Sequence, residues 1–108
     1  MTRLTDIYLV RGERVLVTHQ AVPDPVTLQR TVQAVLAGPS QAEAGHGLRS
    51  ALPGALRLNR VTLDDDTAIV DLTSGLSAVS SQEQALALAQ LVYTVTARPG
   101  VHSLRVLV

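Results

Sequence analysis

The chain has 108 residues, a formal net charge of zero at pH 7 and two aromatic side chains, Tyr8 and Tyr93. A neutral chain has no overall field that attracts nucleic acid or an anionic membrane, and two rings are too few for a base-stacking platform. Cysteine is absent, which excludes disulfides, thiolate metal sites and thiol catalysis. The length predicts a single domain over residues 1–108, with a core of Val, Leu, Ile and Ala.

The N-terminal region predicts a β-hairpin. Residues 7–10 and 14–18 are apolar runs rich in β-branched side chains. The three residues between them, 11–13, include a glycine, and such a link suits a tight connection between two antiparallel strands. Residues 19–23 are then expected to leave the hairpin in an extended conformation, because Val22 precedes a proline.

The next pattern predicts a helix that begins near Asp24. This aspartate is expected as the N-cap, and Pro25 fits the first helical turn, where no backbone donor is needed. Gly38 suits the left-handed residue that ends many helices, and Pro39 forbids continuation. Between these ends, four apolar residues recur at the spacing of one helix face: Leu28, Val32, Val35 and Leu36.

A glycine-containing connector over residues 40–54 leads to a second hairpin. A single helical turn is expected over 41–44, and the length of the connector suggests that it is pinned or functional. In the strand over 56–63 the apolar residues change face, so we expect a one-residue bulge near Asn59 and Arg60. Three aspartates then turn the chain into a strand over 67–72, whose inner face carries Ala68, Val70 and Leu72.

A second helix is predicted from Ser80 to about Thr96, followed by a strand over 101–108. Ser80 and Glu83 have the spacing of a capping box. The helix has only a narrow polar strip, made of Glu83, Gln90 and Thr94. The apolar remainder predicts a helix that is enclosed on more than one side. An alternative, compatible with the first, is that part of it meets another protein, with Leu88, Leu91 and Val95 as the interaction surface.

No catalytic constellation is recognisable. The three histidines, His19, His46 and His102, fall on different predicted elements, and no two have the i, i+4 spacing of a zinc-binding helix. No serine lies in a nucleophile-elbow motif. We interpret the histidines as solvent or loop residues, and we expect no enzyme activity and no cofactor.

Two groups of aspartates need a separate interpretation. Residues 64–66 are consecutive aspartates, whereas a calcium loop spaces its ligands at alternate positions and needs more of them, so we expect a solvated hairpin tip. Asp71 lies inside an apolar strand, where an acid must face solvent or be hydrogen-bonded. We expect it to bind the turn at 73–75 or the backbone of a neighbouring loop.

The charge and hydropathy patterns give no sign of a membrane or nucleic-acid site. Four arginines are candidates for one sheet face, but the neutral net charge favours a solvated face: Arg57, Arg60, Arg98 and Arg105. No apolar run approaches the ~18 residues of a membrane span, and no secretory leader is visible. The chain is therefore cytoplasmic or a domain cut from a longer exported chain, and the strand pattern that continues to Val108 favours the second.

Five short motifs follow one another along the chain. They are YLV at 8–10, VLAGP at 35–39, GLRSALP at 47–53, VDLT at 70–73 and AQLVYTVTARPGVHSLRVLV at 89–108. In this order and spacing the chain resembles the GerMN domain, named after spore-germination and sporulation proteins. The resemblance covers nearly the whole chain. It implies an α+β fold related to ring-building motifs, in which a small mixed or antiparallel sheet has two helices packed on one face, plus an N-terminal hairpin.

The resemblance also implies a role. Such domains are parts of exported lipoproteins or anchored envelope proteins, with no enzyme activity and no catalytic residues to transfer. We therefore expect a non-catalytic domain of the bacterial cell envelope that binds a protein partner or self-associates. It is expected to bind no nucleic acid and not to insert into a membrane. The alternatives are a small-ligand or metal-binding domain, or an unrecognised hydrolase, with a pocket formed by the connector and His46.

Overall fold

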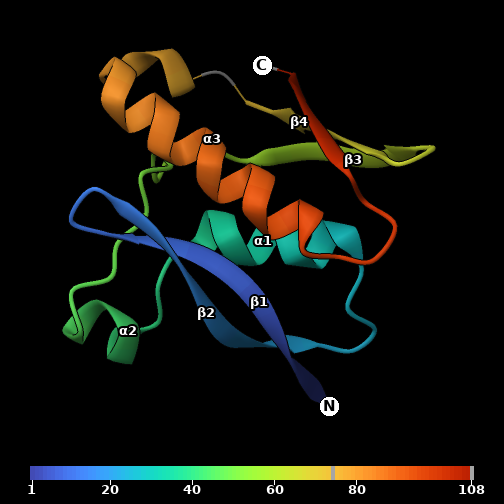
Figure 1. Cartoon of the computed structure of the whole chain (residues 1–108), viewed down its shortest axis with the longest axis horizontal. Helices are drawn as coiled ribbons and strands as arrows, with labels where there is room; N and C mark the ends of the chain where they lie inside the picture. The colour runs from blue at the N-terminus through green and yellow to red at the C-terminus, as the bar shows by residue number, and fades with distance from the viewer. Residues whose placement is uncertain (74, 108) are drawn as a thin grey trace.

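The computed structural model describes residues 1–73 and 75–107 (Figure 1). The strands are β1 (Thr2–Arg11), β2 (Arg14–Pro23), β3 (Leu58–Asp64), β4 (Thr67–Leu72) and β5 (Ser103–Leu107). The helices are α1 (Leu28–Ala37), α2 (Gln41–Gly45), the 3-10 turn η1 (Leu76–Ala78) and α3 (Ser81–Thr96). The predicted α+β class with an N-terminal hairpin is confirmed.

The strands form two separate sheets with the helices packed against them. β1 and β2 are an antiparallel pair, and the second sheet has the order β3-β4-β5. β3 and β4 are antiparallel, whereas β4 and β5 are parallel, because α3 carries the chain back before β5 begins. Figure 1 shows α3 crossing the middle of the molecule, with the hairpin on one side and the three-stranded sheet on the other. α1 contacts α3, β1 and β3.

The N-terminal hairpin is longer than its apolar runs predict. Its register is continuous from the pair Thr2–Pro23 to the pair Arg11–Arg14, so the turn contains only Gly12 and Glu13. Gly12 has a φ of +61°, a conformation that glycine adopts without steric cost. Most residues of the extra pairs are polar or exposed, and Val22 is the buried exception, so these pairs lack the hydrophobic alternation that predicts a strand.

α1 begins three residues later than predicted. Its N-cap is Thr27, whose hydroxyl accepts a hydrogen bond from the Arg30 N–H at 3.1 Å. Asp24 instead belongs to the preceding loop, where the backbone carbonyls of residues 23–25 accept hydrogen bonds from the Arg30 guanidinium. Because these carbonyls face the Arg30 side chain, residues 23–25 are not part of the helix. The predicted apolar stripe is confirmed, since Val32 and Val35 are fully buried.

The second hairpin follows its sequence pattern closely. The register between β3 and β4 shifts between Leu58 and Arg60, which confirms the predicted bulge. Asp65, in the turn, has a φ of +57°, a conformation that aspartate tolerates better than most residues. On β4 the alternation is also confirmed: Ala68 and Val70 are fully buried and Leu72 nearly so.

α3 is oriented differently from the prediction. Gln90 and Thr94, two of the three residues of the polar strip, are buried in the core, with relative exposures of 0% and 1%, whereas the predicted surface residue Leu88 is exposed. They share the inner face with Ala87, Leu91 and Val95. The helix is enclosed on more than one side, as predicted, because it contacts α1, the hairpin and β5.

Hydrogen bonds to the backbone explain why these polar side chains face inward. The Tyr8 N–H donates to the Thr94 hydroxyl at 3.1 Å, and the Gln90 side-chain amide donates to the Tyr8 carbonyl oxygen at 3.1 Å. The Gln90 carbonyl oxygen accepts from the Ala51 N–H at 2.7 Å. α3 therefore satisfies the backbone groups of Tyr8 on the outer edge of β1, the edge that faces away from β2. A buried amide without these partners would cost about 1–3 kcal/mol.

The connector is hydrogen-bonded to both β1 and α3. Arg49 and Val10 exchange two backbone hydrogen bonds of 2.8 Å, so the connector pairs with the end of β1. The Arg49 guanidinium also binds both carboxylate oxygens of Glu83, at 2.9 and 3.0 Å. The capping box predicted for α3 is therefore half formed, because Ser80 caps the Glu83 N–H while the Glu83 side chain binds Arg49 instead. A complete capping box, Ser40 with Glu43, begins α2.

We predict that Thr94→Val destabilises the domain by about 1–3 kcal/mol, because the buried Tyr8 N–H loses its acceptor. The matched control is Thr96→Val, two residues along the same helix. Within the described residues the Thr96 hydroxyl bonds only to the Val92 carbonyl oxygen of its own helix, so its replacement should change stability by less than about 0.5 kcal/mol. Urea denaturation monitored by circular dichroism measures both values. Equal losses in the two variants would contradict the assigned role of Thr94.

A second prediction concerns acid stability. The hydrogen bonds from Arg49 hold the pKa of Glu83 below its ordinary value. A carboxylate whose pKa is lower in the folded state than in the unfolded state stabilises the domain at pH values above the unfolded-state pKa. This stabilisation is lost as the pH falls through the folded-state pKa. The difference in Tm between the parent and Glu83→Gln should therefore be largest at neutral pH and shrink between about pH 5 and pH 3. Gln82→Ala, at an exposed and non-titrating residue in the first turn of α3, is the control and should show no such pH-dependent difference.

Candidate interaction surface

The outward side of α3 is apolar. Ala85, Leu88, Val92 and Tyr93 are exposed there, and we call these four residues the α3 outer face. Leu88 and Val92 are each 38% exposed and Tyr93 is 52% exposed. Glu83, which binds Arg49, is the one charged residue of the helix sequence. The helix thus directs its buried amide and hydroxyl inward and its uncharged, largely apolar side outward.

The interaction surface predicted from the sequence is corrected by this orientation. Leu91 and Val95 are both 0% exposed and belong to the core, so they present no surface to a partner. Leu88 keeps its place on the surface. Val92 and Tyr93 are exposed as well and were not among the three predicted residues, since their apolar character does not distinguish them from the buried side of the helix.

The apolar surface continues from α3 onto the hairpin. The ring of Tyr93 packs against the ring of Tyr8, with centroids 5.4 Å apart and planes tilted by 37°. Tyr8 lies directly opposite Val17 on β2, and Val17 is 45% exposed. Both aromatic residues of the chain are therefore at this junction, which links the α3 outer face to the outer face of the hairpin.

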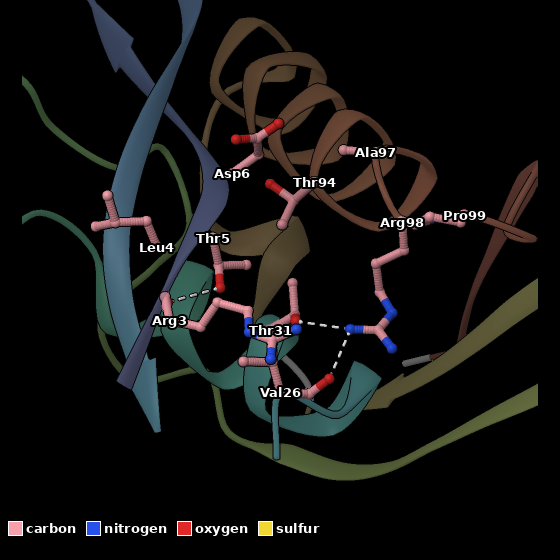
Figure 2. Close-up of a pocket in the computed structure, with 10 residues that line it drawn as sticks. All are labelled: Arg3, Leu4, Thr5, Asp6, Val26, Thr31, Thr94, Ala97, Arg98 and Pro99. Atoms are coloured by element: carbon pink, nitrogen blue, oxygen red, sulfur yellow. Dashed lines mark hydrogen bonds between the residues drawn. The ribbon is translucent and has the colours of Figure 1, made fainter. Parts of the chain in front are cut away.

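A groove of 390 Å³ lies beside this junction, along the N-terminal half of β1 (Figure 2). One wall is the outer edge of β1, at residues 3–6. The other wall is formed by the chain that leaves α3, at residues 97–99. Figure 2 shows Val26 and Thr31 at the floor between the two walls.

An arginine occupies one wall of the groove. The Arg98 guanidinium donates to the Val26 carbonyl oxygen at 2.9 Å and to the Thr31 hydroxyl at 3.5 Å. Arg98 was one of four candidates for a common sheet face, an arrangement that the neutral net charge did not favour, and the structure places it elsewhere. Arg60 and Arg105 are on β3 and β5, whereas Arg98 follows α3 and packs against the start of α1.

The histidines are not brought together as a site. His19 lies across the hairpin from Asp6, with its Nε2 3.1 Å from a carboxylate oxygen, and both side chains are largely exposed. His46 ends α2, and its carbonyl oxygen accepts from Arg11. His102 donates its backbone N–H to the Asp66 carbonyl oxygen. Within residues 1–73 and 75–107, no three His, Asp or Glu side chains are grouped so that they could hold a metal ion.

The aspartates have structural positions. The turn at 64–66 is solvent-exposed, and the Asp66 carbonyl oxygen accepts from His102 and Ser103, which attaches the turn to β5. Asp71 is half-buried on β4, opposite Arg60 in the register. Its predicted contact with the turn at 73–75 involves Ser74, which lies outside the described residues. Thr73 and Arg57 exchange two hydrogen bonds at that turn.

The comparisons with solved structures show related folds. The first GerMN domain of the sporulation protein GerM from Bacillus subtilis is 21% identical, with a TM-score of 0.68 over 97% of this chain and 83% of that one. The tandem GerMN domains of the same protein give 20% identity and a TM-score of 0.71, over 98% of this chain and 39% of that one. A "Putative Lipoprotein" from Clostridium perfringens is 23% identical, with a TM-score of 0.64 over 98% of this chain and 74% of that one.

The described part of the chain has no helix that is long and apolar enough to cross a membrane. No curated protein matches the sequence. The Germane family model, described as sporulation and spore germination, matches residues 6–108. The match spans nearly the whole chain and confirms the resemblance to GerMN domains. The chain therefore belongs to the Germane family.

Proposed function

We propose that this chain is a non-catalytic protein-binding domain that takes part in assembly at the bacterial cell envelope. The observation that carries the proposal is the orientation of α3. Its polar residues Gln90 and Thr94 are used inside the domain, and its outer face exposes Leu88, Val92 and Tyr93. An uncharged, apolar surface that continues across two elements is typical of a protein interface.

The composition of the surface favours a protein partner. Aromatic side chains are enriched at the centre of protein interfaces and charged side chains are depleted there. Tyr8 and Tyr93 meet at the junction of helix and hairpin, and the ring contact restricts both side chains before any partner binds. Restricted side chains lose less entropy on association, which favours binding.

The comparisons support the proposed location. The family is described by sporulation and spore germination, and two of the related structures are from a sporulation protein. A third is named as a lipoprotein. Each is a relative of low sequence identity, so the cell-envelope role is proposed by analogy, while the surface argument depends on this chain alone.

We predict that Leu88→Asp and Val92→Asp each weaken association at least about tenfold, because a charge placed within an apolar interface must be desolvated. Leu63→Asp is the matched control, since Leu63 is an exposed leucine on β3, outside the α3 outer face. Sedimentation velocity over a concentration series measures self-association of the parent and the three variants. Circular dichroism checks that all of them remain folded.

A photo-crosslinking experiment tests for a different protein as partner. Benzoylphenylalanine at position 92 in the native host should give a light-dependent adduct of defined mass. The same residue at position 29, exposed on α1, should not. A monomeric parent at every concentration, together with no adduct from position 92, would refute the proposed function.

A further inference from the structure

One edge of the hairpin is covered over only part of its length. In an antiparallel pair, alternate residues direct their backbone N–H and C=O groups away from the partner strand. On β1 these are the even-numbered residues, as shown by Tyr8, which bonds to α3, and by Val10, which bonds to Arg49. Leu4 and Asp6 share this direction, because the register is continuous.

The covering helix ends where this free edge begins. Thr94 is the last α3 residue that bonds to β1, and the helix stops at Thr96. Within the described residues, no donor or acceptor bonds to the outward backbone groups of Leu4 or Asp6. A strand edge of this kind is a template for one more strand.

The groove beside this edge has room for an extended segment. Its volume of 390 Å³ is within the range of ligand-binding pockets. In Figure 2 the chain at Ala97 and Pro99 faces β1 across the groove and closes its far side. The wall at residues 97–99 faces β1 across the groove, on the side where a sheet neighbour of an added strand would lie. The geometry therefore favours an isolated peptide segment over edge-to-edge pairing of two copies of the domain.

The charges of the groove favour an acidic segment. The Arg98 guanidinium bonds to a carbonyl and a hydroxyl, and no carboxylate in the described part of the chain lies within ion-pair distance of it. Arg3 lies on the β1 wall of the groove. Its Nε is 3.7 Å from a carboxylate oxygen of Asp24, and its side chain is 75% exposed. Asp6 also lines the groove, where it places one carboxylate against the two arginines; that carboxylate lies 3.1 Å from the His19 Nε2 across the hairpin.

We infer that the β1 edge groove binds an extended, acidic peptide segment of a partner protein by β-strand addition. The main chain of the segment bonds to Leu4 and Asp6, and one of its carboxylates binds Arg98. The inference rests on the proposed protein-binding function and adds to it the chemistry of the partner. It locates the contact outside the α3 outer face.

A random heptapeptide library displayed on phage and selected on the parent chain tests the inference. The enriched peptides are then synthesised and titrated by fluorescence polarisation. They should share β-prone residues and at least one Asp or Glu. On binding, the backbone amides of Leu4 and Asp6 should exchange with solvent at least about tenfold more slowly, as expected for hydrogen-bonded groups.

Three variants distinguish peptide binding at the β1 edge from binding elsewhere on the surface. Leu4→Pro removes an outward N–H without touching a bond to β2, and should weaken binding at least about tenfold. Ala21→Pro is the matched control, since Ala21 lies opposite Leu4 and directs its N–H to the other edge of the hairpin. It should leave affinity unchanged. Arg98→Gln should weaken the acidic peptides about threefold to tenfold. Thermal melts of each variant check the fold.

The outcomes distinguish this inference from the proposed function. No enriched peptide, equal affinity for Leu4→Pro and the parent, or selected peptides without acidic residues would each overturn the inference. Peptides that are lost with Leu88→Asp and retained with Leu4→Pro would overturn it while supporting the α3 outer face. Peptides lost with Leu4→Pro and retained with both Ala21→Pro and Leu88→Asp would support it.

Discussion

Two polar side chains of α3 bind the outer edge of β1, the edge that faces away from its partner strand β2. Gln90 and Thr94 together bind both backbone groups of Tyr8, and Gln90 also reaches the connector at Ala51. A strand edge buried without such partners would be strongly unfavourable. The hydrogen-bonding need of β1 therefore fixes the rotation of α3 about its own axis, and with it the sides that face the core and the solvent.

That rotation has a direct effect on the surface. Once Gln90 and Thr94 are directed inward, Leu88, Val92 and Tyr93 must point outward, because helical residues are separated by about 100° of rotation. An orientation chosen by apolar burial alone would place more leucine inside and glutamine outside. The domain buries less apolar side-chain area on α3 because the helix hydrogen-bonds to the backbone of β1. The exposed apolar side of α3 is the result.

Much of the fold could be predicted from local patterns, and the site could not. The bulge near Asn59 follows from a change of hydrophobic face, and the stripe through Val32 and Val35 from helical spacing. The inward direction of Gln90 could not be predicted, because a helical wheel cannot distinguish a polar residue that faces water from one that faces a strand edge. The start of α1 was misplaced for a related reason: Asp24 is a good cap by residue type, but the structure places the cap at Thr27, whose hydroxyl accepts from the Arg30 N–H.

The bond between Tyr8 and Thr94 joins residues that are 86 positions apart in the chain. β5 adds a parallel strand beside β4, which comes before α3 in the sequence. Neither half of the domain can therefore complete its own hydrogen bonding. A nascent chain that ends before α3 exposes a hairpin with an open edge and β4 without its parallel neighbour. We expect the domain to fold cooperatively once β5 has been synthesised, at the modest speed typical of topologies rich in distant contacts.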